Sequence, residues 1–410
     1  MSQQTPASTQ HRSRPKRPLR ILMIAPTSFF SDYGGHIRIL EETRTLEAMG
    51  HRVTIATYYK GSDMPGLDIC RTAPLPWHTD YEVGSSRHKL AFDVYLAVLA
   101  LRVGLHKRPD IIHGHMHEGA LIGGLLARML RIPMVFDFQG SLTAEMVDHK
   151  FLDPNGRIHA LILRLEKFIS AKLPSAVLTS SLQARQLLET EFNVDPGMIF
   201  PLPDCADVDR FHPDLLTAVQ KDQLRRQLKI PLGRPIIAYL GLLTNYQGVP
   251  HLIEAAVGLK ALGVDAHFLI MGYPNVDFYR KMAQENAVAD RVTFTGKIEY
   301  RDAPLYLSLG DIAVAPKISS TEGSGKLLNY MAMAQPIVAY DTAVHREYLS
   351  DSGIYAPPGD VAAFTHRLAD LLANPSEWDC LGSKLRQRAQ TRYSWQVAGE
   401  QIVNVYENLI

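Results

Sequence analysis

The sequence predicts an α/β protein built from two doubly wound parallel-sheet domains that face each other across a cleft. The chain has 410 residues, which is too long for one ordinary hydrophobic core. Short apolar runs without polar alternation, typical of strands covered on both faces, recur between helical segments in both halves. Residues 201–213 (PLPDCADVDRFHP) are dense in proline and aspartate and separate the two series.

The expected domain limits follow from this division. We expect a disordered basic arm over residues 1–18, a first domain over 19–204 and a linker over 205–213. A second domain is expected over 214–393. A final helix over 394–410 has a start signal at Ser394, and we expect it to pack back on the first domain.

The first half opens with a strand over residues 19–25, followed by a loop over 26–35 that ends in Gly34 and Gly35. A helix is then expected to begin at His36, and a strand follows over 53–57. Such folds bind ligands beyond the carboxyl ends of their strands. The paired glycines lack the three-glycine spacing of a dinucleotide fingerprint. Later elements are expected as helices over 90–105, 120–130 and 161–173 and as strands over 110–113, 134–138 and 176–180.

Residues 321–336 (TEGSGKLLNYMAMAQP) are the most informative stretch of the second half. Gly323 and Gly325 lead into a helix over 326–334, which Pro336 ends. A helix start beside glycines suits a phosphate, and the adjacent acid, Glu322, suits sugar hydroxyls. The alternative is a surface loop of an α/β domain. Strands are expected over 236–240, 266–271, 292–295, 311–316 and 337–340.

Composition limits the class of protein. With 46% hydrophobic and 21% charged residues, the chain has the composition of a soluble globular protein. A formal net charge of +1 gives no reason to expect nucleic acid or an acidic partner. Three widely separated cysteines form no metal knuckle and fit a reducing compartment, so we expect a cytoplasmic protein. The basic first twenty residues lack the apolar core of a secretory signal, and form either a solvated arm or a contact with anionic lipid.

The longest apolar run, residues 90–105, allows two interpretations. Asp93 and Arg102 interrupt it, and it is short for a membrane span. It predicts either a buried crossover helix or a helix in the membrane interface whose basic flanks face lipid headgroups. The second interpretation would place the protein peripherally at the inner face of the membrane.

Polar side chains near two expected strand ends are candidates for chemistry. His113, His115 and His117 alternate, so on a strand they would face one side and could converge on a metal. The other interpretation is that His113 is packed and that His115 or His117 faces the cleft. Asp137 and Gln139 alternate in the same way, and Asp137 either faces the cleft or caps the next helix.

Two further motifs carry less weight. Asp207 and Asp209 form an Asp-Val-Asp pair of the kind that can hold a divalent cation, but they fall in the linker, so we do not expect a metal there. Residues 241–248 (GLLTNYQG) form a glycine turn after the first strand of the second half, where a phosphate could lie. This turn contains no arginine or lysine.

Taken together, these motifs resemble those of the retaining nucleotide-sugar glycosyltransferases of glycosyltransferase family 4, which have the GT-B architecture of two Rossmann-like domains. The likeness spans residues 19–410, and it rests on the order and spacing of several motifs. These are Gly34-Gly35, residues 110–115 (DIIHGH), residues 207–211 (DVDRF), Gly241, residues 329–332 (NYMA), residues 335–339 (QPIVA) and the final helix with Trp395.

The resemblance implies a donor site for a nucleotide diphosphate sugar in the second half. The backbone at Lys297 and Ile298 would touch the base. The diphosphate would be held by Gly34, Gly35 and the helix start. The donor-site residues implied in the second half are Gly241, Lys297, Ile298, Lys317, Glu322, Gly323, Ser324, Gly325, Lys326, Leu327 and Asn329.

The resemblance also implies an acceptor site in the first half, near Tyr33, His36, His115 and His117. The expected catalytic residues are Glu322, Lys326, Asp137 and Gln139. Such enzymes need no metal or other cofactor. They retain the anomeric configuration by same-face attack, with the departing phosphate acting as base. Preorganised donors aimed at that phosphate would stabilise the transition state.

The sequence departs from the family pattern at several positions. The second of two family glutamates is here Asn329, and the first, Glu322, lies one residue closer than usual. The arginine and lysine of the family's glycine turn are here Leu242 and Gln247, and a first-domain histidine is Gln139. We hypothesise that Lys326, aided by Lys317, supplies the missing charge.

Three functions follow from these matches and departures. The first is transfer of a hexose-type sugar from a nucleotide diphosphate to a saccharide, lipid or small-molecule acceptor. The second is a catalytically weak GT-B protein that binds sugar, nucleotide or a partner. The third is an enzyme of the same architecture that uses a sugar phosphate as donor.

Overall fold

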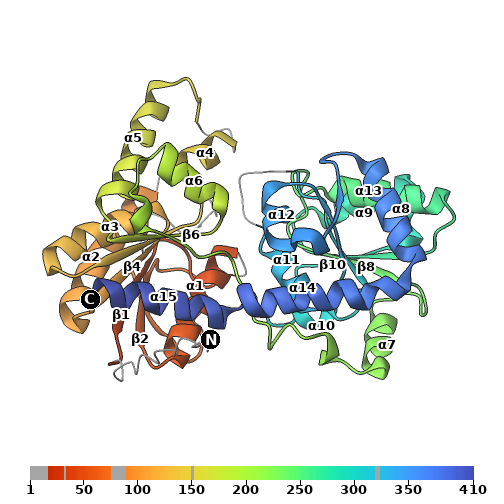
Figure 1. Ribbon diagram of the computed structural model, residues 1–410, viewed down its shortest axis with the longest axis horizontal. Coiled ribbons are helices and arrows are strands. Elements are labelled where there is room, and N and C mark those ends of the chain that lie inside the picture. Colours follow the sequence, from red (N-terminus) through yellow and green to blue (C-terminus); the bar gives the residue numbers. More distant parts are fainter. Residues whose placement is uncertain (1–16, 32–33, 75–88, 149–151, 319–323) are drawn as a thin grey trace, which may run out of the picture.

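The computed structural model describes residues 17–31, 34–74, 89–148, 152–318 and 324–410 (Figure 1). It contains two fully parallel sheets, one of seven strands in the order β3-β2-β1-β4-β5-β6-β7 and one of six in the order β10-β9-β8-β11-β12-β13. In each sheet the strand order reverses next to the first strand of the series, as in doubly wound folds. The predicted fold class is therefore confirmed.

The first sheet separates two apolar cores, because successive residues of its central strand point to opposite faces. Leu22 and Ile24 face helices α2, α3, α5 and α6, whereas Ile21 and Met23 face α1 and α15. The strands are β1 (Arg20–Ala25), β2 (Arg52–Thr57), β3 (Asp68–Arg71), β4 (Ile111–His115), β5 (Met134–Phe138), β6 (Ala176–Thr179) and β7 (Ile199–Pro201). The helices are α1 (Gly34–Ala48), α2 (Lys89–Lys107), α3 (Met116–Leu130), α4 (Leu142–Asp148), α5 (Arg157–Lys172), α6 (Leu182–Thr190), α15 (Trp395–Leu409) and the 3-10 turn η1 (Pro196–Met198).

The second sheet is built in the same way. Helices α8, α9 and α13 cover one face, and α10, α11, α12 and α14 cover the other. The strands are β8 (Ile236–Leu240), β9 (His267–Met271), β10 (Val292–Gly296), β11 (Ile312–Ala315), β12 (Ile337–Tyr340) and β13 (Ile354–Ala356). The helices are α7 (Ala218–Gln227), α8 (Val249–Ala261), α9 (Val276–Glu285), α10 (Ala303–Leu307), α11 (Lys326–Ala332), α12 (Ala343–Leu349), α13 (Val361–Ala373) and α14 (Trp378–Arg392). Short 3-10 turns are η2 (Pro213–Leu215), η3 (Ala289–Arg291), η4 (Ser350–Ser352) and η5 (Pro375–Glu377).

The chain passes between the two sheets twice, and the two passages are joined. The backbone N–H of Ala206 donates to the carbonyl of Tyr393 (2.8 Å), and Arg386 of α14 donates to the carbonyls of Val208 and Phe211. Helix α15 then lies on α1, where Gly399 faces Thr45 so closely that an added Cβ would lie 2.4 Å from Thr45 Cγ2 (Figure 1). We propose that residues 205–213 act as the linker between domains over 19–204 and 214–393.

Two predicted details are corrected. Helix α1 begins at Gly34 and not at His36, so both glycines belong to its first turn and not to the preceding loop. Helix α2 is neither fully buried nor fully exposed: Leu96 and Ala100 on one side are buried, whereas Leu90 and Val94 on the other are exposed. In the part of the chain that the structure describes, no helix is both long enough and apolar enough to cross a membrane.

Candidate active site

A buried ionic network lies where α1 crosses the carboxyl ends of β4 and β5. The guanidinium of Arg38 donates to both carboxylate oxygens of Asp137, at 3.0 Å from Nε to Oδ2 and 2.8 Å from Nη2 to Oδ1. Its Nη1 atom donates to Asp204 at 3.2 Å. Burial alone would raise the pKa of Asp137, but the charge of Arg38 and the hydrogen bond from His115 outweigh it and hold that pKa below its usual range. Asp137 is therefore a fixed anion.

Asp137 accepts hydrogen bonds from three side chains. Besides Arg38, Nδ1 of His115 donates to Oδ2 at 3.1 Å and Nε2 of Gln139 donates to the same oxygen at 2.7 Å. Its side chain has no exposed surface. This corrects both sequence interpretations of Asp137, because it neither faces open space nor caps helix α4. Glu166 accepts from the first backbone amides of α4 instead.

The three alternating histidines do not converge. Strand β4 ends at His115, and Met116 adopts a left-handed conformation (φ 57°) that starts helix α3. His117 therefore lies in a helix, where its ring packs against Phe136 and Phe138 and Nε2 is 3.2 Å from Glu166 Oε1. The alternative in which all three histidines converge on a metal therefore does not hold. The prediction that His115 or His117 faces the cleft is also wrong, because both rings are buried.

A different group of metal-ligand types does gather in the first half: Glu42, His113, His115 and Asp137, whose ligand atoms lie within 4.8 Å of one another. Nε2 of His113 and of His115 lie 3.8 and 4.0 Å from Glu42 Oε2. Burial and then the nearby charge of Asp137 raise the pKa of Glu42, while burial and then His115 lower the pKa of His113. Nε of Arg38 lies 3.0 Å from Glu42 Oε1, so a fixed positive charge already occupies this cluster.

The remaining first-half predictions, for the acceptor residues and for the donor-binding glycines, have mixed outcomes. His36 is buried, and its ring bonds to Thr27 and Ser31 of the β1–α1 loop, so it shapes that loop and does not present itself to an acceptor. Gly34 is exposed, with open space where a Cβ would be, while a Cβ on Gly35 would lie 3.3 Å from Gln139 Oε1. Tyr33 lies outside the described residues.

In the second half, the start of α11 meets the glycine turn. Nζ of Lys326 donates to Gln247 Oε1 at 2.6 Å and lies 4.5 Å from the centre of the Tyr239 ring. A Cβ on Gly241 would lie 3.0 Å from the same Nζ atom. The two stretches that were singled out separately in the sequence, residues 241–248 and the start of α11, therefore form one site beyond the ends of β8 and β11.

A second lysine lies near the first. Lys317 is buried, and its positive charge, like that of Lys326, disfavours protonation of His345. Burial first, and these two charges after it, lower the pKa of His345 to about 4. The ring is kept neutral and donates from Nδ1 to the Tyr340 carbonyl at 2.7 Å. Both ammonium groups therefore lie within electrostatic range of His345.

Some donor-side predictions need correction. The Leu327 backbone amide donates to the Ser324 carbonyl at 2.9 Å and its side chain is fully buried, so neither can reach a diphosphate. Helix α11 has only seven residues, so its dipole is a weak source of attraction compared with the Lys326 ammonium group. Gly325 lies next to Asp204, where an added Cβ would be 3.5 Å from Oδ2. Glu322 and Gly323 lie outside the described residues.

The other predicted donor residues have the following surroundings. Nζ of Lys297 is 5.4 Å from the centre of the Tyr273 ring, and Ile298 packs against the core beside α11. Asn329 is half-buried within α11, and the Ser324 side chain is buried with no hydrogen-bond partner for its hydroxyl among the described residues.

Sequence reasoning missed Arg38, Glu42 and Asp204. The available signal was the i,i+4 pair of Arg38 and Glu42 on the helix face that also carries apolar residues, because a charge pair on a buried face needs partners inside. Asp204 was assigned to the end of the first domain without a role.

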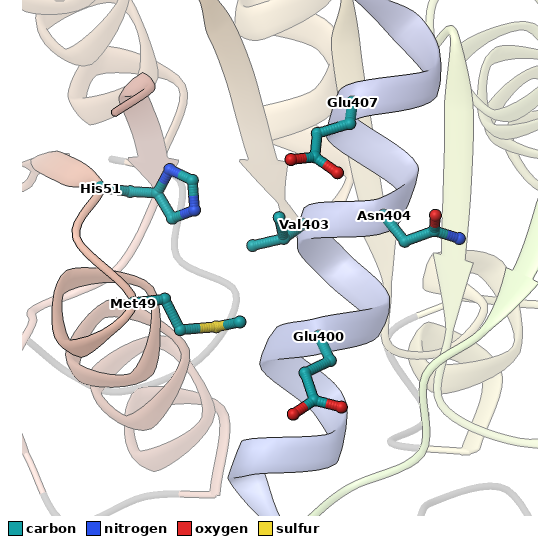
Figure 2. A pocket seen from close by; sticks show the side chains of 6 residues that line it. All are labelled: Met49, His51, Glu400, Val403, Asn404 and Glu407. Carbon is teal, nitrogen blue, oxygen red and sulfur yellow. The ribbon is translucent and has the colours of Figure 1, made fainter. Parts of the chain in front are cut away.

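A separate pocket of about 370 Å³ lies between the end of α1 and α15 (Figure 2). Figure 2 shows Met49 and His51 facing Glu400, Val403 and Glu407 across it. His51 precedes β2, so this pocket lies at the amino ends of the strands, opposite to the edge that carries the residues above. It takes no part in the candidate site.

Two family models match consecutive parts of the chain: a "Glycosyl transferase 4-like domain" over residues 34–205 and "Glycosyl transferases group 1" over residues 220–392. Together they span most of the sequence. The chain is a GT-B glycosyltransferase of the family 4 type. This confirms the resemblance drawn from its motifs.

The glycosyltransferase has curated relatives at moderate identity. It is 26% identical over 304 residues to an alpha-D-kanosaminyltransferase from Streptomyces kanamyceticus, covering 73% of this chain and 77% of the relative. It is 25% identical over 404 residues to a phosphatidyl-myo-inositol mannosyltransferase from Mycobacterium leprae, covering 95% of this chain and 97% of the relative. A crystal structure of Anabaena Alr3699/HepE in complex with UDP shares the fold, with a TM-score of 0.74, 14% identity and coverage of 95% of this chain and all of that one.

Proposed function

We propose that this glycosyltransferase moves a hexose-type sugar from a nucleotide diphosphate donor to a saccharide or lipid acceptor, without a metal ion and with retention of anomeric configuration. In this proposal the second half binds the donor and the first half binds the acceptor. The sugar ring lies between them, near the start of α1 and the start of α11.

The observation that carries the proposal is the position of the Lys326 ammonium group. Related enzymes are expected to hold the diphosphate with an arginine and a lysine in the glycine turn, and Leu242 and Gln247 stand there in this chain. Nζ of Lys326 reaches Gln247 Oε1 at 2.6 Å. The ammonium group of Lys326, a residue of α11, therefore lies beside a glycine turn whose own residues carry no positive charge. Buried Lys317 is a second cation whose charge, like that of Lys326, acts on His345.

The chemistry of the first half supports the proposed mechanism. Asp137, the acid at the carboxyl end of β5, is fully buried and bonded to Arg38, His115 and Gln139, which leaves it unsuited to attack a sugar carbon. This favours a reaction in which the departing phosphate takes the proton of the acceptor hydroxyl. Ammonium groups beside that phosphate stabilise its growing negative charge.

The relatives support the substrate classes. The Mycobacterium leprae relative is named for a phosphatidylinositol acceptor, and the Anabaena protein was crystallised with UDP. These names favour a nucleotide donor and a hydroxyl-bearing saccharide or lipid headgroup as acceptor. The base and the sugar are left to experiment.

Thermal shift with a panel of nucleoside diphosphates and sugar nucleotides, with EDTA present, tests the proposal. A ligand that binds only the folded state raises the unfolding temperature, so one nucleotide should stand out. Release of that nucleoside diphosphate in the presence of an acceptor then shows transfer, and NMR of the product shows whether configuration is retained. Binding without transfer would favour the catalytically weak protein, and a response to sugar phosphates alone would favour the third function.

A further inference from the structure

Helix α2 carries an apolar stripe on its outer side. Its inner side packs on the first sheet through residues that include Phe92, Leu96 and Ala100, all fully buried. The opposite side repeats at i, i+4, i+8, i+11 and i+15, which is one face of a helix. The exposed apolar residues of this face are Leu90, Val94, Val98, Leu101 and Leu105. Only the inner face of α2 packs on the sheet, so packing within the domain does not explain this second apolar stripe.

Two neighbouring helices extend the apolar surface. Helix α3 packs beside α2 and α5 packs beside α3, so the three form one layer over the same face of the sheet (Figure 1). We call their outward side the α2–α3–α5 face. Its exposed apolar members on the second and third helices are Leu125, Met129, Ile158, Leu161, Leu165 and Phe168. More than half of the large apolar side chains found exposed in the described residues lie on these three helices.

The exposed charges of these three helices have one sign. The exposed charged residues of the three helices and of the cap of α3 are Arg102, Lys107, Arg128, Arg131, Arg157, Arg164 and Lys172. The acids of the same helices are turned away or already paired. Asp93 accepts from the Tyr58 hydroxyl at 2.6 Å, Glu118 pairs with Lys89 at 2.5 Å, and Glu166 is fully buried. Among these cations, Lys107 is paired with Asp68 of β3.

We propose that the α2–α3–α5 face docks on the surface of an anionic lipid bilayer. Soluble proteins rarely expose an apolar patch of this extent without a partner. Aliphatic and aromatic side chains interleaved with arginine and lysine, with no exposed acid on the helices, match the boundary between acyl chains and anionic headgroups. An ordinary protein partner would not require the absence of acids. The inference does not rest on the choice of donor or acceptor.

The docked helices would lie in the plane of the interface. The three helices cover the side of the first sheet opposite to α1 and α15, and the chain does not need to open to expose them. The ends of β4 and β5 lie at the edge of this layer, so docking would hold the first half of the site close to the headgroups without burying it.

Vesicle co-sedimentation of the full chain tests the proposal. Wild-type protein should sediment with phosphatidylcholine–phosphatidylglycerol vesicles at least tenfold more strongly than with phosphatidylcholine alone, and high salt should weaken the binding. The variant Val94→Gln/Val98→Gln should lose about tenfold, and Arg102→Gln/Arg164→Gln should lose the preference for the anionic vesicles. The matched control Val219→Gln/Phe278→Gln removes two exposed apolar side chains of the second half and should bind as wild type.

Several outcomes would overturn the proposal. These are absence of binding, equal binding to both vesicle types, or an unchanged affinity in the Val94→Gln/Val98→Gln variant with an unchanged unfolding temperature. Light scattering that shows a dimer which this variant dissociates would instead assign the face to a second copy of the chain. Loss of binding only in Arg12→Gln/Arg14→Gln/Lys16→Gln would assign lipid contact to the basic arm. None of these results depends on the donor screen, so the two proposals can fail separately.

Discussion

The Nζ atom of Lys326 lies 2.6 Å from Oε1 of Gln247, and this contact joins two stretches that are 79 residues apart in the sequence. Gln247 stands where a cation is expected in related glycosyltransferases, and Lys326 brings a cation to it from the neighbouring helix. The charge of the proposed diphosphate site is therefore relocated and not lost.

Replacing Lys326 with methionine should weaken donor binding. A hydrogen bond to a charged group contributes about 1.5–3 kcal/mol, which corresponds to a rise of about 10- to 150-fold in the Kd of the donor. Lys326→Arg should retain part of the affinity. Isothermal titration with the nucleoside diphosphate found in the screen measures both, and Lys281→Met, which removes an exposed lysine of α9, serves as control. An unchanged Kd in Lys326→Met would exclude this lysine from the site.

Removing Arg38 alone should destabilise the first half strongly. Arg38→Met leaves the buried charge of Asp137 without its main partner, and breaking a buried ion pair in this way costs about 3–5 kcal/mol. Adding Asp137→Asn should recover part of that loss, because the unpaired charge disappears. Denaturant unfolding of the two single variants and the double variant measures the coupling. Strict additivity would show that the two side chains do not interact.

The final helix should contribute to the stability of the first sheet through one hydrogen bond. The Tyr406 hydroxyl lies 2.6 Å from Nδ1 of His113, and both groups are buried. Tyr406→Phe removes the bond and leaves His113 without a partner there, so we expect a loss of about 1–3 kcal/mol in the free energy of unfolding. A variant as stable as wild type would mean that the ring of Tyr406, and not its hydroxyl, holds α15 in place.

Stability should fall in mildly acidic solution because of His345. Its pKa is about 4 in the folded protein and 6.5 in the ordinary state, so between these values the unfolded chain binds more protons than the folded one. Above about pH 6.5 the histidine is neutral in both states and does not lower the free energy of unfolding. As the pH falls toward 4, protonation of this group in the unfolded chain lowers the free energy of unfolding by about 3 kcal/mol. His345→Asn, which can keep the bond to the Tyr340 carbonyl, should flatten the profile. The same slope in both proteins would contradict this assignment.

Much of the fold could be predicted because it depends on local pattern. Largely apolar runs at residues 19–25 and 134–138 indicate central parallel strands whatever the distant contacts are. Short edge strands such as β3, β7 and β13 have three or four residues and no such run, so their existence depends on neighbours. The helical position of His117 was missed because the alternation of a strand was assumed to continue beyond His115. The left-handed backbone of Met116 ends the strand at that point.

The site was harder to predict than the fold. The glycine turn and the start of α11 were each identified from residue types, but their contact through Lys326 and Gln247 is a tertiary relationship. The network around Arg38 joins α1, β5 and Asp204, and only the paired charges on one helix hinted at it. Asp137 was selected for its place at a strand end, yet whether it faces a ligand or other protein groups is decided by the side chains that pack over it.

A crystal structure of the enzyme with the nucleoside diphosphate selected by thermal shift tests the central claim most directly. We predict phosphate oxygens within hydrogen-bonding distance of Lys326 Nζ and beside the backbone of Gly241. Two results would contradict the account: a nucleotide bound elsewhere, or an unchanged Lys326–Gln247 hydrogen bond with no ligand beside the glycine turn.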